Sequence, residues 1–146
     1  MRKYRYSRDS EVWLKHAMAD TRVAKIFLRD DGDDEQYSAA AAFWSQRCAE
    51  KSLIAYILFR EQLFEEEACL EKHLIQCVKL DKQFAALAPV IAVLSPYDAY
   101  SEDPEAMPDV DRKKAEQAIV HAQRIFDFVR NIVPEKQNSL VVDTSG

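Results

Sequence analysis

The residues of this sequence that could bind a soft metal are three histidines and three cysteines. Cys69, His73 and Cys77 recur every fourth position, which would place their side chains on one stripe of a continuous helix. No fourth ligand follows from the sequence, and we expect Cys69 to precede the start of the helix. The spacing therefore favours a structural or capping role for these residues, and we predict no metal site.

A second candidate for metal chemistry is the acidic run from Asp30 to Glu35, interrupted only by Gly32. Loops of the DxDxDG type bind Ca²⁺ through carboxylates, and a glutamate closes the loop at its twelfth position. Here the corresponding downstream residues, Ala39 to Trp44, contain no glutamate. The spacing thus argues against calcium, and we expect the acids to flank the start of a helix, where they are favourable.

The chain carries a formal net charge of −5, which disfavours nonspecific binding to a nucleic-acid duplex. Its first eight residues, MRKYRYSR, are nevertheless basic and contain two tyrosines. Basic residues between aromatic ones could bind single-stranded nucleic acid, or the segment could be a solvated terminus. We expect this segment to be a solvated terminus.

Composition and periodicity predict an all-α fold. The sequence has two glycines, whereas sheets and phosphate-binding loops need many, and helix-favouring residues dominate. Helical periodicity extends over four segments: Asp9 to Asp30, Gln36 to Leu63, Lys72 to Phe84 and Asp111 to Val133. Between the last two come an apolar stretch from Ala85 to Leu94, which Pro89 should interrupt, and an irregular loop from Tyr97 to Asp111.

These segments predict one domain, an up-and-down bundle of about five helices over residues 9–133. Residues 1–8 are expected to be a flexible basic N-terminus and residues 134–146 a flexible tail. We find no signal peptide and no apolar run long enough for a membrane span, so we expect a cytoplasmic protein with free thiols and no membrane contact. Cys48 is expected to be small core filler.

The sequence resembles the HEPN family of small helical bundles. Its first helix has the pattern W-x3-A-x2-D-x3-A, at Trp13, Ala17, Asp20 and Ala24. Its second has an aromatic residue followed by Q-x2-A-E-K-x-L, at Phe43, Gln46, Ala49, Glu50, Lys51 and Leu53. His73-Leu74 opens the third helix, and a tyrosine-rich loop with Tyr97, Tyr100 and Pro104 follows.

The chain departs from the family in two places. The family's loop usually reads Arg-Tyr-Pro, but this chain has Glu102-Asp103-Pro104, an acidic pair that would weaken phosphate binding. Ribonucleases of the family carry an arginine four to six residues before a histidine. No arginine stands at that spacing before His16, His73 or His121, so we expect that the chain is not an enzyme and has no catalytic residues.

The resemblance implies a non-catalytic module that binds a nucleotide, a nucleic-acid end such as that of an RNA, or a nucleotidyltransferase-type partner protein. The candidate binding residues are Glu50, Lys51, His73, Tyr97 and Tyr100. No cofactor is expected. Two alternatives remain open: a toxin-like ribonuclease with an atypical active site, and a helical scaffold without a small-molecule ligand.

We also expect a homodimer. Ile54, Ile57, Leu58 and Phe59 make the second helix apolar around most of its circumference. A small bundle would leave part of that surface uncovered, and twofold pairing is the commonest way to bury it.

Overall fold

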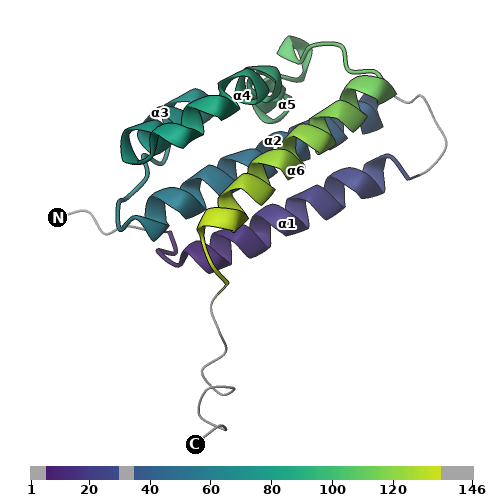
Figure 1. Ribbon diagram of the computed structural model, residues 1–146. Coiled ribbons are helices and arrows are strands. Elements are labelled where there is room, and N and C mark those ends of the chain that lie inside the picture. Colours follow the sequence, from purple (N-terminus) through teal and green to yellow (C-terminus); the bar gives the residue numbers. More distant parts are fainter. Residues whose placement is uncertain (1–5, 30–34, 136–146) are drawn as a thin grey trace, which may run out of the picture.

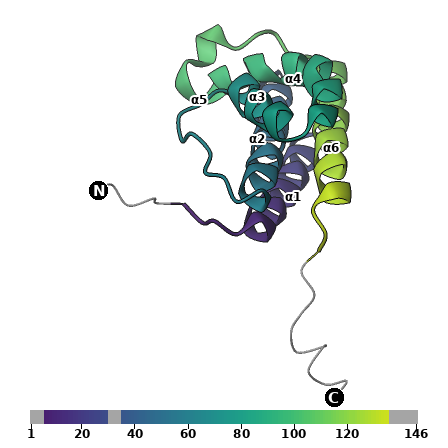
Figure 2. The ribbon, with the colours of Figure 1, turned by 60° about the vertical axis from the view of Figure 1, so that its left-hand side comes forward.

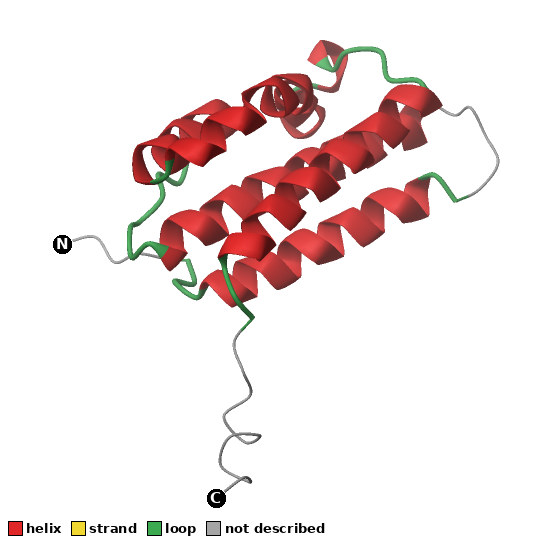
Figure 3. Ribbon diagram, viewed as in Figure 1, coloured by secondary structure: helices red, strands yellow, loops and turns green. Residues whose placement is uncertain are grey.

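A computed structural model of the 146-residue chain describes residues 6–29 and 35–135, which form helices joined by short connections and contain no strand (Figure 3). The α-helices are α1 (Ser10–Phe27), α2 (Glu35–Phe59), α3 (Leu70–Leu80), α4 (Ala88–Leu94), α5 (Ala99–Glu102) and α6 (Arg112–Ile132). The 3₁₀ turns are η1 (Lys82–Leu87), η2 (Ser95–Asp98) and η3 (Pro104–Ala106). The predicted all-α bundle is confirmed.

Three long helices, α1, α2 and α6, form what we call the three-helix half (Figure 1). Small side chains fill the surfaces along which these helices meet, which lets the backbones approach closely. The fully buried alanines are Ala17 and Ala24 of α1, Ala41, Ala42, Ala49 and Ala55 of α2, and Ala115, Ala118 and Ala122 of α6. An ion pair between Glu11 and Arg130 joins the start of α1 to the end of α6.

The remaining short helices, residues 70–106, form a covering layer on the other side of α2 (Figure 2). The layer carries the chain back to the end of the bundle where α2 begins (Figure 1). Because α2 lies between two layers, it is buried around most of its circumference. Two of its buried hydroxyls are satisfied locally: Ser45 donates to the Ala41 carbonyl and Ser52 to the Cys48 carbonyl.

Carboxylate caps and a proline explain where several helices begin. The Asp9 carboxylate accepts a hydrogen bond from the Glu11 amide at the start of α1, and Asp111 caps α6 in the same way. Pro89 lies in the first turn of α4, where a missing N–H costs nothing, and the chain before it is a 3₁₀ turn. The interruption expected at Pro89 is therefore present as a boundary between η1 and α4.

Some predicted boundaries were wrong. The second helix ends at Phe59 instead of Leu63, and the third ends at Leu80 because Asp81 caps a separate 3₁₀ turn there. The segment from Tyr97 to Asp111, expected to be irregular, contains the short helical turns η2, α5 and η3. Three-residue and four-residue helices lack the periodicity that a sequence can reveal.

The reason given for a homodimer is not supported by the structure. Ile54, Ile57 and Leu58 are buried within the single chain, and only Phe59 of that set is exposed. The covering layer removes from solvent the surface that a partner was expected to cover. Pairing of two chains stays a prediction, but it needs a different surface.

At the N-terminus, Tyr6 is the first residue that the structure describes. Its ring packs against Trp13 and Phe64, which ties the entry of the chain to the bundle. The first five residues and residues 30–34, which make up most of the acidic run, lie outside the described part of the chain, as does the tail from residue 136.

Candidate functional site

Lys51 and Glu50 are neighbours in sequence, but they point to different layers. The Lys51 ammonium lies 2.8 Å from the Asp20 carboxylate of α1, and the two side chains are 18% and 8% exposed. This ion pair joins α1 to α2 inside the three-helix half. Lys51, which we predicted to bind a ligand, therefore connects α2 to α1.

Glu50 belongs to the other side of α2, facing the covering layer. Its carboxylate lies 3.2 Å from the Arg47 guanidinium, one helical turn before it. Burial raises the pKa of Glu50, the charge of Arg47 opposes that rise, and the nearby carboxylate of Asp98 in η2 adds to it. The Glu50 carboxylate thus lies close to one guanidinium and to a second carboxylate from a separate element.

His73, in the first turn of α3, is buried beside this group. Its side chain is 1% exposed, and neither ring nitrogen has a hydrogen-bond partner among the described residues. Burial lowers the pKa of His73 to about 4; the charge of Arg47 also lowers it, and Glu65 opposes. A structural role for His73 is consistent with this burial, but it is not a capping one, since the ring packs edge-on against Phe64 and its nitrogens donate to no described group.

The two predicted tyrosines come from consecutive turns of the covering layer. Tyr97 of η2 is buried, and burial together with the Asp111 carboxylate raises its pKa. Tyr100 of α5 is half-buried and packs against Phe43 of α2, with ring centroids 5.3 Å apart. Phe43 lies one turn before Arg47, so Tyr100 is next to the polar group on the same side of α2.

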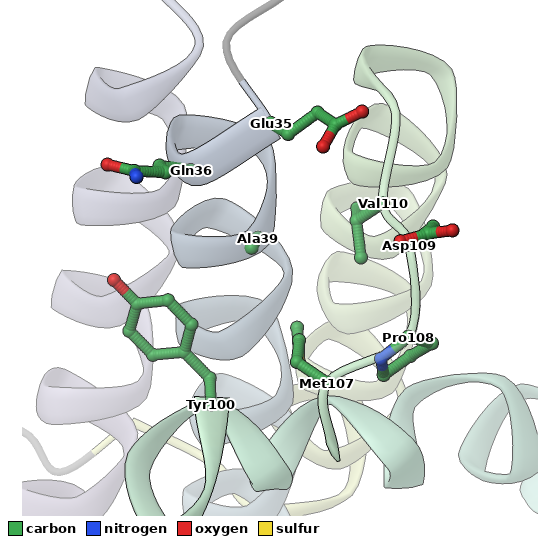
Figure 4. Close-up of a pocket in the computed structure, with 8 residues that line it drawn as sticks. All are labelled: Glu35, Gln36, Ala39, Tyr100, Met107, Pro108, Asp109 and Val110. Carbon is green, nitrogen blue, oxygen red and sulfur yellow. The ribbon is translucent and has the colours of Figure 1, made fainter. Parts of the chain in front are cut away.

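Beyond Tyr100, the start of α2 and the chain that leads into α6 border an open hollow of about 520 Å³ (Figure 4). Tyr100 stands on one side and Met107 faces it, with Ala39 behind them on α2 (Figure 4). The described residues that line the hollow are Glu35, Gln36, Ala39, Tyr100, Met107, Pro108, Asp109 and Val110. None of these carries a positive charge, and two are carboxylates.

The segment that forms this side of the molecule is acidic throughout. Residues 97–111 contain six aspartates and glutamates and no lysine, arginine or histidine. On α6, the Lys114 ammonium donates to the main-chain carbonyl oxygen of Asp109 over 3.4 Å. A phosphate placed in the hollow would meet two carboxylates, and the positive end of the α2 macrodipole, about half a charge, does not offset them.

The structure therefore brings Glu50, His73 and Tyr100 to one side of α2 and leaves Lys51 on the other. Sequence reasoning missed Arg47, although its position three residues before Glu50 predicts a helical ion pair. It also missed Glu35 and Asp109 as neighbours. No local signal joins them, because they lie far apart in sequence and meet only through the path of the covering layer.

The other two histidines lie outside this region. His16 is exposed on α1. His121, half-buried on α6, lines a shallow hollow of about 330 Å³ together with Lys113, Glu116, Gln117 and Val120. Within residues 6–29 and 35–135, no group of three or more His, Cys, Asp or Glu side chains is arranged to hold a metal ion. No described helix is long and apolar enough to cross a membrane.

Residues 10–132 match the HEPN domain, which is most of the chain, and the chain belongs to this family. Its fold is similar to that in the crystal structure of TT1696 from Thermus thermophilus, with a TM-score of 0.68 and 26% sequence identity. That similarity covers 85% of this chain and 98% of TT1696. A search of curated proteins gave no match.

Proposed function

We propose that this chain is a non-catalytic HEPN module that binds a protein partner of the nucleotidyltransferase type through the acidic segment 97–111, which runs from the end of the covering layer to the start of α6. The partner class comes from the family resemblance. Residues 97–111 have six acidic and no basic side chains. This negative charge is the observation that favours a protein over a nucleotide as the ligand. Basic partner surfaces are attracted to such a face, and phosphates are repelled.

The environment of His73 argues against catalysis in this region. A general base must reach the proton that it removes, yet both ring nitrogens of His73 are buried. Arg47 is the arginine beside His73 that could bind a phosphate, but its guanidinium is already paired with the Glu50 carboxylate. A substrate phosphate would have to displace that carboxylate and also overcome the charge of Asp98.

Calorimetry with the protein encoded by the neighbouring gene tests the proposal, provided that gene encodes a nucleotidyltransferase-type protein. We expect heat of binding with this partner and none with AMP or ATP. The double variant Glu105→Lys/Asp109→Lys should bind the partner about tenfold or more weakly, because like charges then face each other. Raising the salt concentration should weaken wild-type binding.

The matched control is Glu67→Lys, which changes an exposed acid in the connection between α2 and α3, outside residues 97–111. It should bind the partner like the wild type. Saturable binding of ATP together with no binding of the partner would refute the proposal. Equal weakening by the control and the double variant would also count against it, because the location of the charge would then not matter.

A further inference from the structure

The hollow beside Tyr100 has walls of three chemical kinds. Ala39, Met107, Pro108 and Val110 give it an apolar interior and Tyr100 gives it an aromatic wall, while the side chains of Glu35 and Asp109 lie at its outer rim, on the side away from Tyr100 (Figure 4). A volume of about 520 Å³ lies within the range of small-ligand sites, so one long side chain fits with room to spare.

Among biological groups, an arginine side chain combines the features that match these walls. Its methylene stem packs on apolar surface while its guanidinium remains at a polar rim. The planar guanidinium binds carboxylates through two parallel hydrogen bonds and stacks on aromatic faces, whereas the lysine ammonium is a strongly hydrated point charge. A phosphate or carboxylate ligand would meet Glu35 and Asp109 without a compensating cation in the lining.

We propose that this hollow is a binding pocket for an arginine side chain, which the partner protein inserts between Tyr100 and Met107. The inference rests on the proposed function for the source of the arginine, but the pocket itself can be tested without the partner. The stem lies between Tyr100 and Met107, where the small side chain of Ala39 leaves space, and the guanidinium reaches the carboxylates of Glu35 and Asp109 at the outer rim (Figure 4). Lys114, at the outer side of Asp109, reduces the attraction.

A two-dimensional NMR titration with N-acetyl-arginine amide tests the pocket directly on the full chain. We expect saturable shifts of the amide signals of Ala39, Tyr100 and Val110, with a dissociation constant that is roughly millimolar for so small a probe. The citrulline analogue has the same shape without the charge and should give no saturable shifts. Shifts scattered over the surface, or equal shifts with citrulline, would overturn the proposal.

Three variants separate charge from shape. Glu35→Gln/Asp109→Asn should weaken arginine binding at least fivefold, and Lys114→Gln should strengthen it, because the change in charge is opposite. Ala39→Leu fills the pocket and should abolish the localised shifts. The control Glu67→Gln/Asp127→Asn removes the same charge from exposed positions elsewhere and should leave the affinity within twofold. Circular dichroism verifies that each variant is folded.

Each outcome is decisive for one of the two proposals. If the partner protein binds as proposed but arginine binds nowhere or binds equally well to Ala39→Leu, the pocket assignment fails and the proposed function survives. If arginine binds in the pocket but the partner does not bind, the pocket stands and the nucleotidyltransferase-type partner is wrong. AMP shifting the same amide signals as arginine would overturn the pocket's specificity for cations.

Discussion

The two layers on either side of α2 are built on different principles. The three-helix half packs long helices through buried alanines and closes with the Asp20–Lys51 and Glu11–Arg130 ion pairs. The covering layer uses short helices and 3₁₀ turns, and its Tyr100 borders the hollow that the start of α2 and residues 107–110 also line. Regular packing stabilises the first, whereas irregular backbone in the second creates concave surface, as expected for a part that binds.

The largest expected effect is on the ion pair inside the three-helix half. Lys51→Ala leaves the Asp20 carboxylate buried without its partner and should lower the free energy of unfolding by roughly 3 kcal/mol. Urea denaturation measures this change. Glu116→Ala, which removes the exposed pair with Arg112, is the control and should cost under about 1 kcal/mol. Similar losses of unfolding free energy for both variants would show that the buried ion pair stabilises the fold no more than the exposed one.

The second effect concerns His73, at the boundary between the layers. Its pKa is about 4 in the folded chain, against 6.5 for the ordinary side chain. The unfolded chain therefore binds the proton more readily, so stability is fully present above pH 6.5 and is lost as the pH falls toward 4. By pH 4 the wild type should lose about 3 kcal/mol relative to His73→Leu, which cannot be protonated there.

Urea denaturation of both proteins at several pH values measures this difference. The raised pKa of Glu50 acts in the opposite direction, because its folded form keeps the proton to higher pH. Since both proteins retain Glu50, its contribution cancels in the comparison. Parallel stability curves for the wild type and His73→Leu would mean that the ring is hydrated in the folded chain.

The arrangement of the long helices followed from the sequence, and that of the covering layer did not. Apolar residues at helical spacing predicted α1, α2 and α6 to within a few residues, and the family pattern added Asp20 and Lys51 without explaining them. Their ion pair crosses between helices, which no single-helix pattern shows. The short turns from Ser95 to Ala106 are fixed by tertiary contacts such as Tyr100 on Phe43, so their sequence looked irregular.

For the candidate site, sequence reasoning found the side chains but not their grouping. Glu50, His73 and Tyr100 were singled out and do lie on one side of α2. The burial of His73 could not be predicted, because a histidine at a helix start is equally compatible with exposure. The acids at Glu35 and Asp109 come together only after the chain has folded back.

A smaller effect is expected for self-association, which would use the three-helix half and leave the covering layer free. Val120 of α6 is 65% exposed and Ile26 of α1 is 55% exposed. Val120 borders a hollow of about 600 Å³ whose lining includes Lys25, Arg124 and Asp127, charges of both signs that can pair across a twofold axis.

Sedimentation equilibrium should give about twice the chain mass of 16.8 kDa at micromolar concentration. Val120→Glu should shift the equilibrium toward the single chain. The control Val93→Glu, on α4 of the covering layer, should not. A single-chain mass for the wild type would rule out the dimer, and dissociation by the control alone would move the interface to the covering layer.

The central claim, that the module is non-catalytic, is tested most directly by incubating the purified chain with single-stranded RNA. His121 is the remaining candidate for an atypical active site, because it shares its shallow hollow with Lys113. We predict no cleavage by the wild type, and no difference between it and His121→Ala. RNA cleavage by the wild type that disappears in His121→Ala would contradict this claim and make the chain a ribonuclease.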